Sequence, residues 1–137
     1  MLALEWLEPT FAPGHWVPEM IEHAGGTSLI GTAGGHSVEV SWKSLQGLDP
    51  DVLIIMPCGY DLETTKRDAQ QASTQLLEVA PRAIANGNAF VVDGSAYFNR
   101  SGPRFVIGLE ILAGLLHPDR FDAPPAGTAE RWQPLQP

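Results

Sequence analysis

Stretches of the chain without polar residues predict the strands at its centre. Val52–Met56 and Ala89–Val92 are apolar at every position. Such runs are typical of strands that are covered on both faces, as in the parallel sheet of an α/β domain. The mostly apolar run Leu2–Leu7 predicts a first strand, and Ser28–Ile30 predicts a short second one. We therefore expect about four strands.

Between these strands, apolar residues recur at the spacing of amphipathic helices. The expected helices lie at residues 17–24, 42–47, 62–79 and 105–116. Ser41, Asp61 and Ser101 stand just before the last three helices, where their side chains are expected to cap the first turn. Segments 10–14 and 31–35 are marked by Pro or Gly and are expected to be loops.

The alternation of strands and helices predicts an α/β fold with three layers. Alternating elements usually form a mainly parallel sheet with right-handed crossovers, flanked by helices. We expect this single lobe to cover residues 1–118. Residues 119–137 are rich in Pro and Ala and predict an extended tail, with Trp132 and Leu135 as the residues expected to lie against the domain.

Composition and charge exclude several classes of protein. The net charge of −8 argues against nucleic-acid binding, because phosphates require a basic surface. No apolar run approaches the roughly 20 residues that a membrane-spanning helix needs. The first residues lack the basic and small-residue features of a secretory signal, so a cytoplasmic location is expected. The single cysteine, Cys58, excludes an internal disulfide and offers no metal-ligand spacing.

Three predicted loops are expected to meet at one edge of the sheet. They are residues 6–16, 57–61 and 93–104. Open α/β sheets bind their ligands at the carboxyl ends of the strands. The side chains with rings in these loops are Trp6, Phe11, His15, Trp16, Tyr60, Tyr97 and Phe98. Rings give a large and stiff contact area, so this edge predicts a site for a broad, partly apolar ligand.

Several of these rings have a structural alternative. Trp6 and Trp16 can equally belong to the core, since tryptophan is mostly buried on average. His15 suits an axial metal ligand or a general base, and also a histidine that is only hydrogen-bonded. The other histidines are His23, His36 and His117. They share no ligand spacing, so no metal cluster is expected.

Two arginines flank the start of the last expected helix. Arg100 and Arg104 lie where free backbone N–H groups and guanidinium groups together suit an anion. The alternative is that Arg100 pairs with Asp93 or Asp61 across the loops.

Motifs of catalysis are absent from the sequence. It contains no nucleophile elbow, no HExxH and no CxxC, and Cys58 has no predicted basic partner. We therefore expect a binding protein rather than an enzyme. A small hydrolase or transferase that uses His15, Asp61 and Cys58 is the catalytic alternative.

At the same loops the chain resembles a known family. The segments that carry the likeness are ALEWLEPTFAPGHWVPEMIEHAGG, VSW, LDPDVLIIMPCGYDLE, VVDGSAYFNRSGPR and GLEILAGLLHP, between Leu2 and Pro118. They resemble the substrate-binding proteins of cobalamin and iron-siderophore ABC transporters, and closely the cobalamin-binding branch. The resemblance implies a class III periplasmic binding protein, whose two α/β lobes are joined by a long helix and clamp the ligand. This chain resembles the C-terminal lobe alone.

The resemblance also implies a ligand and its contacts. The ligand-contacting positions fall on Trp6, Phe11, His15, Trp16, Gly59, Tyr60, Tyr97, Phe98, Arg100 and Arg104. The implied ligand is cobalamin or another corrinoid, with a ferric siderophore or haem as less favoured choices, and no intrinsic cofactor. A periplasmic location is implied if the chain is part of a longer exported receptor.

Partners follow from the same resemblance. A single lobe cannot enclose a ligand, so a homodimer through the inter-lobe face is one expected arrangement. Family members dock on the permease through a glutamate in an SxE pattern, where this chain has Ser41-Trp42-Lys43. Lys43 reverses that charge, which argues against docking there, although Glu39 is close in sequence. The alternative function is an interaction or regulatory module that kept the fold and lost the ligand.

Overall fold

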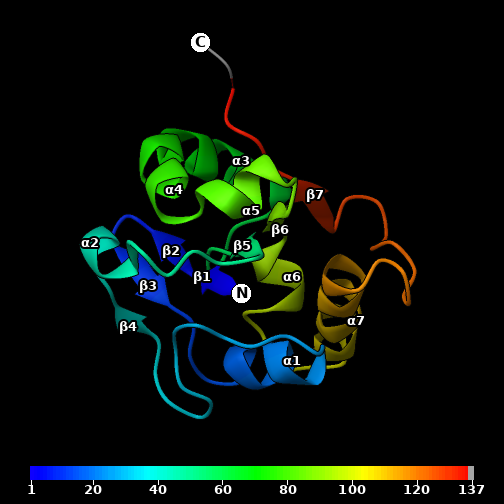
Figure 1. Ribbon diagram of the computed structural model, residues 1–137. Coiled ribbons are helices and arrows are strands. Elements are labelled where there is room, and N and C mark those ends of the chain that lie inside the picture. Colours follow the sequence, from blue (N-terminus) through cyan, green and yellow to red (C-terminus); the bar gives the residue numbers. More distant parts are fainter. Residues whose placement is uncertain (136–137) are drawn as a thin grey trace.

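The computed structural model describes residues 1–135 and has a four-stranded sheet at its centre (Figure 1). In spatial order, the strands are β1 (Leu2–Leu4), β5 (Leu53–Ile55), β6 (Ala89–Val92) and β7 (Ala129–Arg131). Strands β1, β5 and β6 run parallel, and β7 pairs antiparallel with β6. The expected mainly parallel sheet of about four strands is confirmed.

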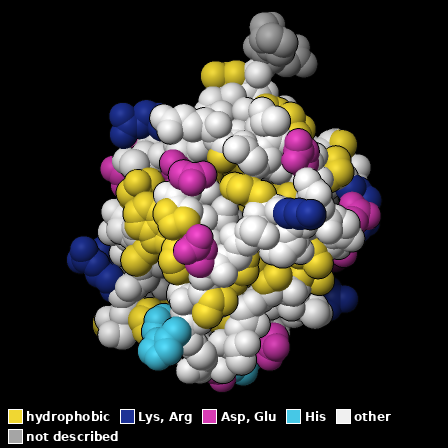
Figure 2. Space-filling view, turned by 90° about the vertical axis from the view of Figure 1, so that its left-hand side faces the viewer, with side chains coloured by type: hydrophobic (Ala, Val, Ile, Leu, Met, Phe, Trp, Pro, Cys, Tyr) yellow, Lys and Arg dark blue, Asp and Glu magenta, His cyan; other side chains and the backbone are white. Residues whose placement is uncertain are grey.

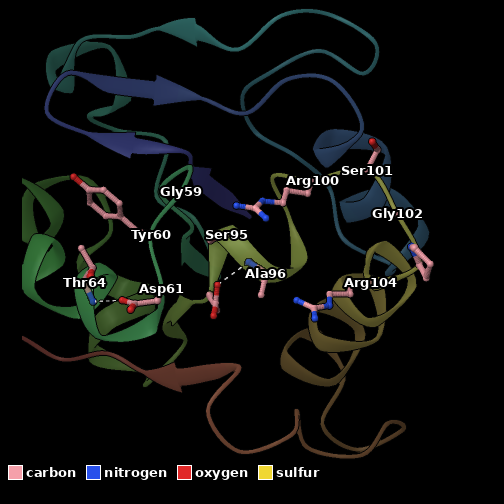
Figure 3. Close-up of a pocket in the computed structure, with 12 residues that line it drawn as sticks. Gly59, Tyr60, Asp61, Thr64, Ser95, Ala96, Arg100, Ser101, Gly102 and Arg104 are labelled. Atoms are coloured by element: carbon pink, nitrogen blue, oxygen red, sulfur yellow. Dashed lines mark hydrogen bonds between the residues drawn. The ribbon is translucent and has the colours of Figure 1, made fainter.

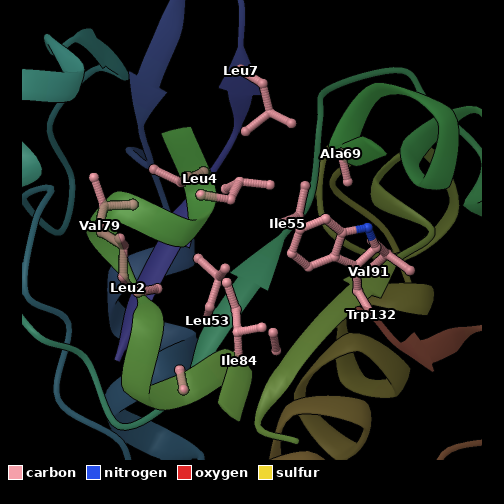
Figure 4. Close-up of a cluster of buried hydrophobic side chains, with 14 of the residues drawn as sticks. Leu2, Leu4, Leu7, Leu53, Ile55, Ala69, Val79, Ile84, Val91 and Trp132 are labelled. Atoms are coloured by element: carbon pink, nitrogen blue, oxygen red, sulfur yellow. The ribbon is translucent and has the colours of Figure 1, made fainter. Parts of the chain in front are cut away.

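Helices cover both faces of this sheet, which gives the expected three layers (Figure 1). One face carries α3 (Leu62–Gln71), α4 (Ser73–Val79) and α5 (Pro81–Ala85), and the other carries α1 (Val17–His23) and α7 (Arg104–Leu116). Successive strand residues point to opposite faces. Leu53 and Ile55 therefore pack under α3–α5, in the cluster of Figure 4, while Ile54 and Met56 pack against α1 and α7.

Two of the three expected helix caps are present. The remaining helices, α2 (Trp42–Leu45) and α6 (Gly94–Tyr97), are short. The side chains of Ser41 and Asp61 accept the backbone N–H three residues ahead, at 3.2 and 2.8 Å, and so cap α2 and α3. The expected cap by Ser101 is wrong, because the N-cap residue of α7 is Pro103 and no side chain caps it.

Within residues 1–135, no helix has both the length and the apolar character needed to cross a bilayer.

The helix expected over residues 62–79 is divided in two. Its backbone departs from helical geometry at Ala72, where α3 ends and α4 begins. Pro81 does not simply end the helical region, because it occupies the first turn of α5. Proline is favoured there since its missing N–H would have no partner within the helix.

The amino-terminal segment forms a second sheet that the sequence did not predict. Its antiparallel strands are β2 (Trp6–Leu7), β3 (Thr10–Ala12) and β4 (Val38–Glu39). The expected strand Leu2–Leu7 is therefore two strands that separate at Glu5, and the expected loop 10–14 contains β3. The expected strand Ser28–Ile30 is wrong. The Ser28 hydroxyl donates to the Ile30 carbonyl at 2.7 Å, a local bond that competes with strand pairing.

The segment after residue 118 contributes to the sheet. Residues 129–131 form β7, and Trp132 is only 4% exposed within the core under α3–α5. The contact expected of Trp132 is present, while Leu135 is 77% exposed. The boundary expected at residue 118 needs correction, because the edge strand beside β6 comes from the presumed tail. Residues 136 and 137 of that tail lie outside the described part of the chain.

Candidate functional site

Two adjoining hollows lie where strands β5 and β6 end. The larger one, here called the arginine hollow, has a volume of about 730 Å³ (Figure 3). It is lined by Gly59, Tyr60, Asp61, Thr64, Asp93, Ser95, Ala96, Arg100, Ser101, Gly102, Pro103 and Arg104. The smaller one, the Glu5 hollow, measures about 250 Å³. It is lined by Glu5, Gly14, His15, Trp16, Val17, Ser37, Cys58, Phe98 and Asn99.

The turn after β5 forms one wall of the arginine hollow. Tyr60 N–H donates to the Pro57 carbonyl at 3.2 Å and closes a tight turn. Gly59 sits in this turn at φ +80°, where a side chain would strain the backbone although the space around it is open. Asp61 then caps α3, and hydrogen bonds from Thr64 lower the pKa of the Asp61 carboxyl. The cap fixes the turn to the start of a ten-residue helix.

Helix α6 forms the facing wall and is held against this turn by backbone contacts. The Ser95 N–H donates to the Tyr60 carbonyl at 3.1 Å, and the Asn99 side-chain amide donates to the Pro57 carbonyl at 3.3 Å. A Cβ at Gly94 would overlap the Pro57 carbonyl oxygen, so only glycine permits this approach. The two walls are therefore fixed relative to each other.

The two arginines point into the hollow from its third side (Figure 3). Arg100 and Arg104 are exposed, and neither takes part in an ion pair among residues 1–135. The alternative partners of Arg100 are occupied otherwise, because Asp61 caps α3 and Asp93 caps α6. Both guanidinium groups are thus available to donate to a bound molecule.

Aromatic side chains lie beside the arginine hollow. The rings of Trp6 and Tyr60 meet edge to face with centroids 5.0 Å apart, and Phe11 stands opposite Trp6 in the β2–β3 pair. All three side chains are partly exposed. Figure 2, which views the side of the molecule with β4 and α2, shows hydrophobic side chains gathered in a broken band across its middle, with acidic ones among them. The ring cluster, our name for Trp6, Phe11 and Tyr60, therefore offers an apolar surface beside the arginine hollow.

The segment before α1 brings His15 and Trp16 to the Glu5 hollow. His15 is exposed and adopts φ 55°, and its ring lies 5.5 Å from that of His36. The Trp16 indole N–H donates to the Phe98 carbonyl at 2.9 Å, which ties this segment to the loop after α6. His36 was not expected here, because only the loop 31–37 brings it close to His15.

Not every predicted site residue lines a hollow. Phe98 does line the Glu5 hollow, but it is 1% exposed and belongs to the core cluster of α1 and α7, so the residue predicted as a ligand contact is also a core residue. Tyr97 packs partly against the same cluster and lines neither hollow, and Phe11 lines neither as well. Lys43 and Glu39 are exposed, away from both hollows.

Sequence reasoning missed Glu5, a buried carboxylic acid at the floor of the smaller hollow. The residue is 7% exposed, and its carboxyl group accepts a hydrogen bond from the Ser37 hydroxyl. Burial raises the pKa of Glu5, while the bond from Ser37, the nearby His15 and a backbone bond from Gly14 act in the opposite direction. The available signal was a charged residue inside the apolar run LALEWL.

The raised pKa of Glu5 predicts a pH-dependent stability. The folded state holds the Glu5 proton more tightly than the unfolded state, so this group's contribution to stability falls as the pH rises past about 4.3. Glu5→Gln cannot ionise. We expect the free energy of unfolding of the variant, relative to that of the wild type, to increase as the pH rises above about 4.3 and to level off once Glu5 is ionised in the folded state as well. Urea denaturation measures this, and Glu22→Gln at an exposed site controls for net charge. If the difference in free energy of unfolding between Glu5→Gln and the wild type did not change with pH, burial would not raise the pKa of Glu5.

The described part of the chain offers neither a metal cluster nor an activated thiol. Within residues 1–135, no group of three or more His, Cys, Asp or Glu side chains is arranged to hold a metal ion. Desolvation, and then the negative charge of Glu5, raise the pKa of the exposed Cys58 thiol. Because the thiolate is the nucleophile, this environment disfavours attack by Cys58.

Comparisons with known proteins identify the fold. A scan against protein-family models finds no match, and a search of curated proteins finds no similar sequence. A periplasmic heme-binding protein from Pseudomonas aeruginosa is similar in structure, with a TM-score of 0.64, 20% identity, and coverage of 85% of this chain and 43% of that protein. The TroA-like periplasmic binding protein FepB from Veillonella parvula has a TM-score of 0.57, 15% identity, and coverage of 88% and 40%. The chain thus spans less than half of either protein and has the fold of a single α/β lobe of such proteins.

Proposed function

We propose that this chain, which folds like one lobe of a periplasmic binding protein, is a non-catalytic lobe that binds a corrinoid. In this proposal the chain corresponds to the C-terminal lobe of such a protein. In this proposal the two hollows and the ring cluster form one wall of the binding site, and a second lobe provides the other wall.

The arrangement of the arginine hollow carries the proposal. Arg100 and Arg104 point into an open cavity and have no carboxylate partner among the described residues, while Trp6 and Tyr60 form an apolar surface beside it. A broad macrocycle can lie on rings while polar groups at its rim accept hydrogen bonds from the guanidinium groups. One structural neighbour is a heme-binding protein, which supports a metal-containing macrocycle as the kind of ligand.

Charge favours a corrinoid over an anionic ligand. A corrinoid is rimmed with neutral amides, whereas haem carries propionates and many ferric siderophores are anionic. The net charge of −8 opposes the approach of an anion, and Glu5, Asp61 and Asp93 all border the hollows. Arginine can also donate to the carbonyl oxygen of a neutral amide.

Titration with cyanocobalamin tests the function directly. We expect saturable quenching of tryptophan fluorescence at micromolar concentrations, with weaker effects of haemin and a ferric catecholate. Trp6→Phe should remove a large part of the quenching, because Trp6 contacts Tyr60 at the arginine hollow. Trp42→Phe, in α2 away from both hollows, is the matched control. Absence of saturable quenching up to tens of micromolar would contradict corrinoid binding.

Removal of one arginine should weaken the complex. Hydrogen bonds from charged groups contribute about 1.5–3 kcal/mol, so Arg100→Ala is expected to raise the Kd for cyanocobalamin by about 10- to 100-fold. Arg120→Ala, an exposed arginine outside both hollows, should leave the Kd unchanged. Isothermal titration calorimetry measures both values. Equal affinities of the two variants would count against a role of Arg100 in binding.

Light scattering distinguishes the alternative, an interaction module without a ligand. A lobe that needs a second wall should pair with another copy when cyanocobalamin is present. A dimer that forms equally without ligand, and that is disrupted by Trp6→Ala, would favour the interaction module.

A further inference from the structure

We infer that the Glu5 hollow is a second contact site for the ligand, one that accepts an N–H donor such as a peripheral primary amide and excludes a carboxylate. This inference rests on the proposed function, because it assigns a role to the cavity next to the arginine hollow. It identifies Glu5 as a residue that determines ligand specificity.

The carboxylate of Glu5 has accepting capacity left over. A carboxylate has about four lone-pair positions. Ser37 and the backbone of Gly14 donate to it, and no Lys or Arg pairs with it in the described part of the chain. The Glu5 side chain lines the hollow although it is 7% exposed, so little water reaches it. A donor that enters the hollow therefore meets a desolvated acceptor, where a hydrogen bond is stronger than in water.

Backbone contacts fix the position of Glu5 and its partner. The His15 N–H donates to the Gly35 carbonyl at 2.6 Å, and the Gly34 N–H donates to the His15 carbonyl at 2.8 Å. Gly14 touches the backbone at Ser37 so closely that an added Cβ would overlap it. The loop is thereby held against the segment before α1, and Ser37 is held over Glu5. These contacts join the Ser37 loop closely to the segment before α1, and Ser37 donates from this loop to Glu5.

The size of the cavity suits one substituent of a larger molecule. A volume of about 250 Å³ equals the volume that about eight water molecules occupy in the liquid. The apolar side chains Trp16, Val17 and Phe98 line it together with Glu5 and Ser37. Such walls match the methylene groups of an acetamide or propionamide arm, while the acceptor on the floor matches its N–H.

The two hollows can contact the same molecule. Cys58 lines the Glu5 hollow, and its neighbour Gly59 lines the arginine hollow. Likewise, Asn99 lines the Glu5 hollow, and its neighbour Arg100 lines the arginine hollow. A single ligand across this boundary meets donors on one side and an acceptor on the other. An amide-rimmed ligand has carbonyl groups for the arginines and N–H groups for Glu5. A ligand rimmed only with carboxylates offers no donor and brings like charges together at Glu5.

The experiment compares cyanocobalamin with its monocarboxylic acids, each of which has one peripheral amide hydrolysed. Wild-type protein and Glu5→Gln are titrated with cyanocobalamin and with the separate isomers by calorimetry. For the wild type, we expect the Kd of at least one isomer to be about tenfold or more above that of cyanocobalamin. For Glu5→Gln, we expect the Kd values of the same two ligands to differ by less than about threefold. An identical preference of both proteins for every isomer would overturn the inference while leaving corrinoid binding intact. Failure of the wild type to bind cyanocobalamin would overturn the proposed function and the inference together.

A second variant covers the case in which Glu5→Gln does not fold. Ser37→Ala removes a donor from Glu5 and leaves one more acceptor position of the carboxylate free. Because the bond from Ser37 also lowers the pKa of Glu5, this variant and the wild type are compared at alkaline pH, where Glu5 is ionised. We expect Ser37→Ala to reject the same isomer at least as strongly as the wild type does. Loss of that rejection in Ser37→Ala would overturn the inference. Glu22→Gln, which changes the net charge by the same amount as Glu5→Gln at an exposed site, should keep the wild-type preference.

Discussion

Replacement of Trp132 by alanine is expected to lower the free energy of unfolding by about 3–5 kcal/mol, the range for large aromatic residues removed from a core. Trp132 is 4% exposed and packs in the cluster under α3–α5 together with Leu53 and Ile55 (Figure 4). Its backbone N–H also donates to the Ala89 carbonyl at 2.8 Å. The residue therefore joins the last strand to the core.

Urea denaturation followed by circular dichroism measures this effect. Leu135→Ala is the matched control, because Leu135 is 77% exposed and its removal should change the stability by less than about 0.5 kcal/mol. If both substitutions had effects of this small size, the segment after residue 118 would not be an integral part of the domain.

Replacement of Phe98 by alanine is expected to destabilise the protein by a similar amount, about 3–5 kcal/mol. Phe98 is 1% exposed and lies in the cluster that joins α1 and α7 to the sheet. The effect distinguishes a core residue from a ligand contact, because a residue that serves only binding would alter affinity and leave stability nearly unchanged. Phe98→Leu should restore a large part of the stability, since it refills most of the cavity.

Phe11→Ala is the comparison for Phe98→Ala. Phe11 is partly exposed in β3, so its removal leaves no closed cavity and should cost clearly less stability. Thermal or urea unfolding of both variants gives the difference. Equal losses of stability would mean that the two phenylalanines have the same structural role.

The central strands were predictable because their residues are apolar on both faces. Strands β5 and β6 lie in the middle of the sheet between two helical layers, and each of their positions needs an apolar side chain. Asp61 was predictable as a cap for a similar local reason, since its partner is three residues away. Features that depend on neighbouring residues can be inferred from a sequence.

Features that depend on distant residues were missed. The residues of β7, Ala129-Glu130-Arg131, have low strand propensity, and they form a strand because the edge of β6 supplies hydrogen-bond partners. Glu5 and Ser37 are 32 positions apart, so their contact leaves no local pattern. Phe98 lies in a loop that was predicted to contact the ligand, yet its side chain is buried in the core.

The site was predicted in part for the same reasons. Gly59, Tyr60, Arg100 and Arg104 follow strand ends, and strand ends of a parallel sheet meet at one edge, so their convergence followed from topology. The division into two hollows with different chemistry was not predictable, because it depends on the second sheet and on the glycine contact at Gly14.

The polar strand β7 has a consequence for aggregation. It occupies the open side of β6, an entirely buried apolar strand that would otherwise expose unpaired backbone groups. Charged residues on an outer strand discourage intermolecular strand addition. Glu130 and Arg131 are exposed and of opposite sign, so they allow the sheet to end in water. Deletion of the chain from residue 119 onward would leave Phe90–Val92 with an unpaired edge, and such a shortened protein should aggregate through edge-to-edge strand pairing.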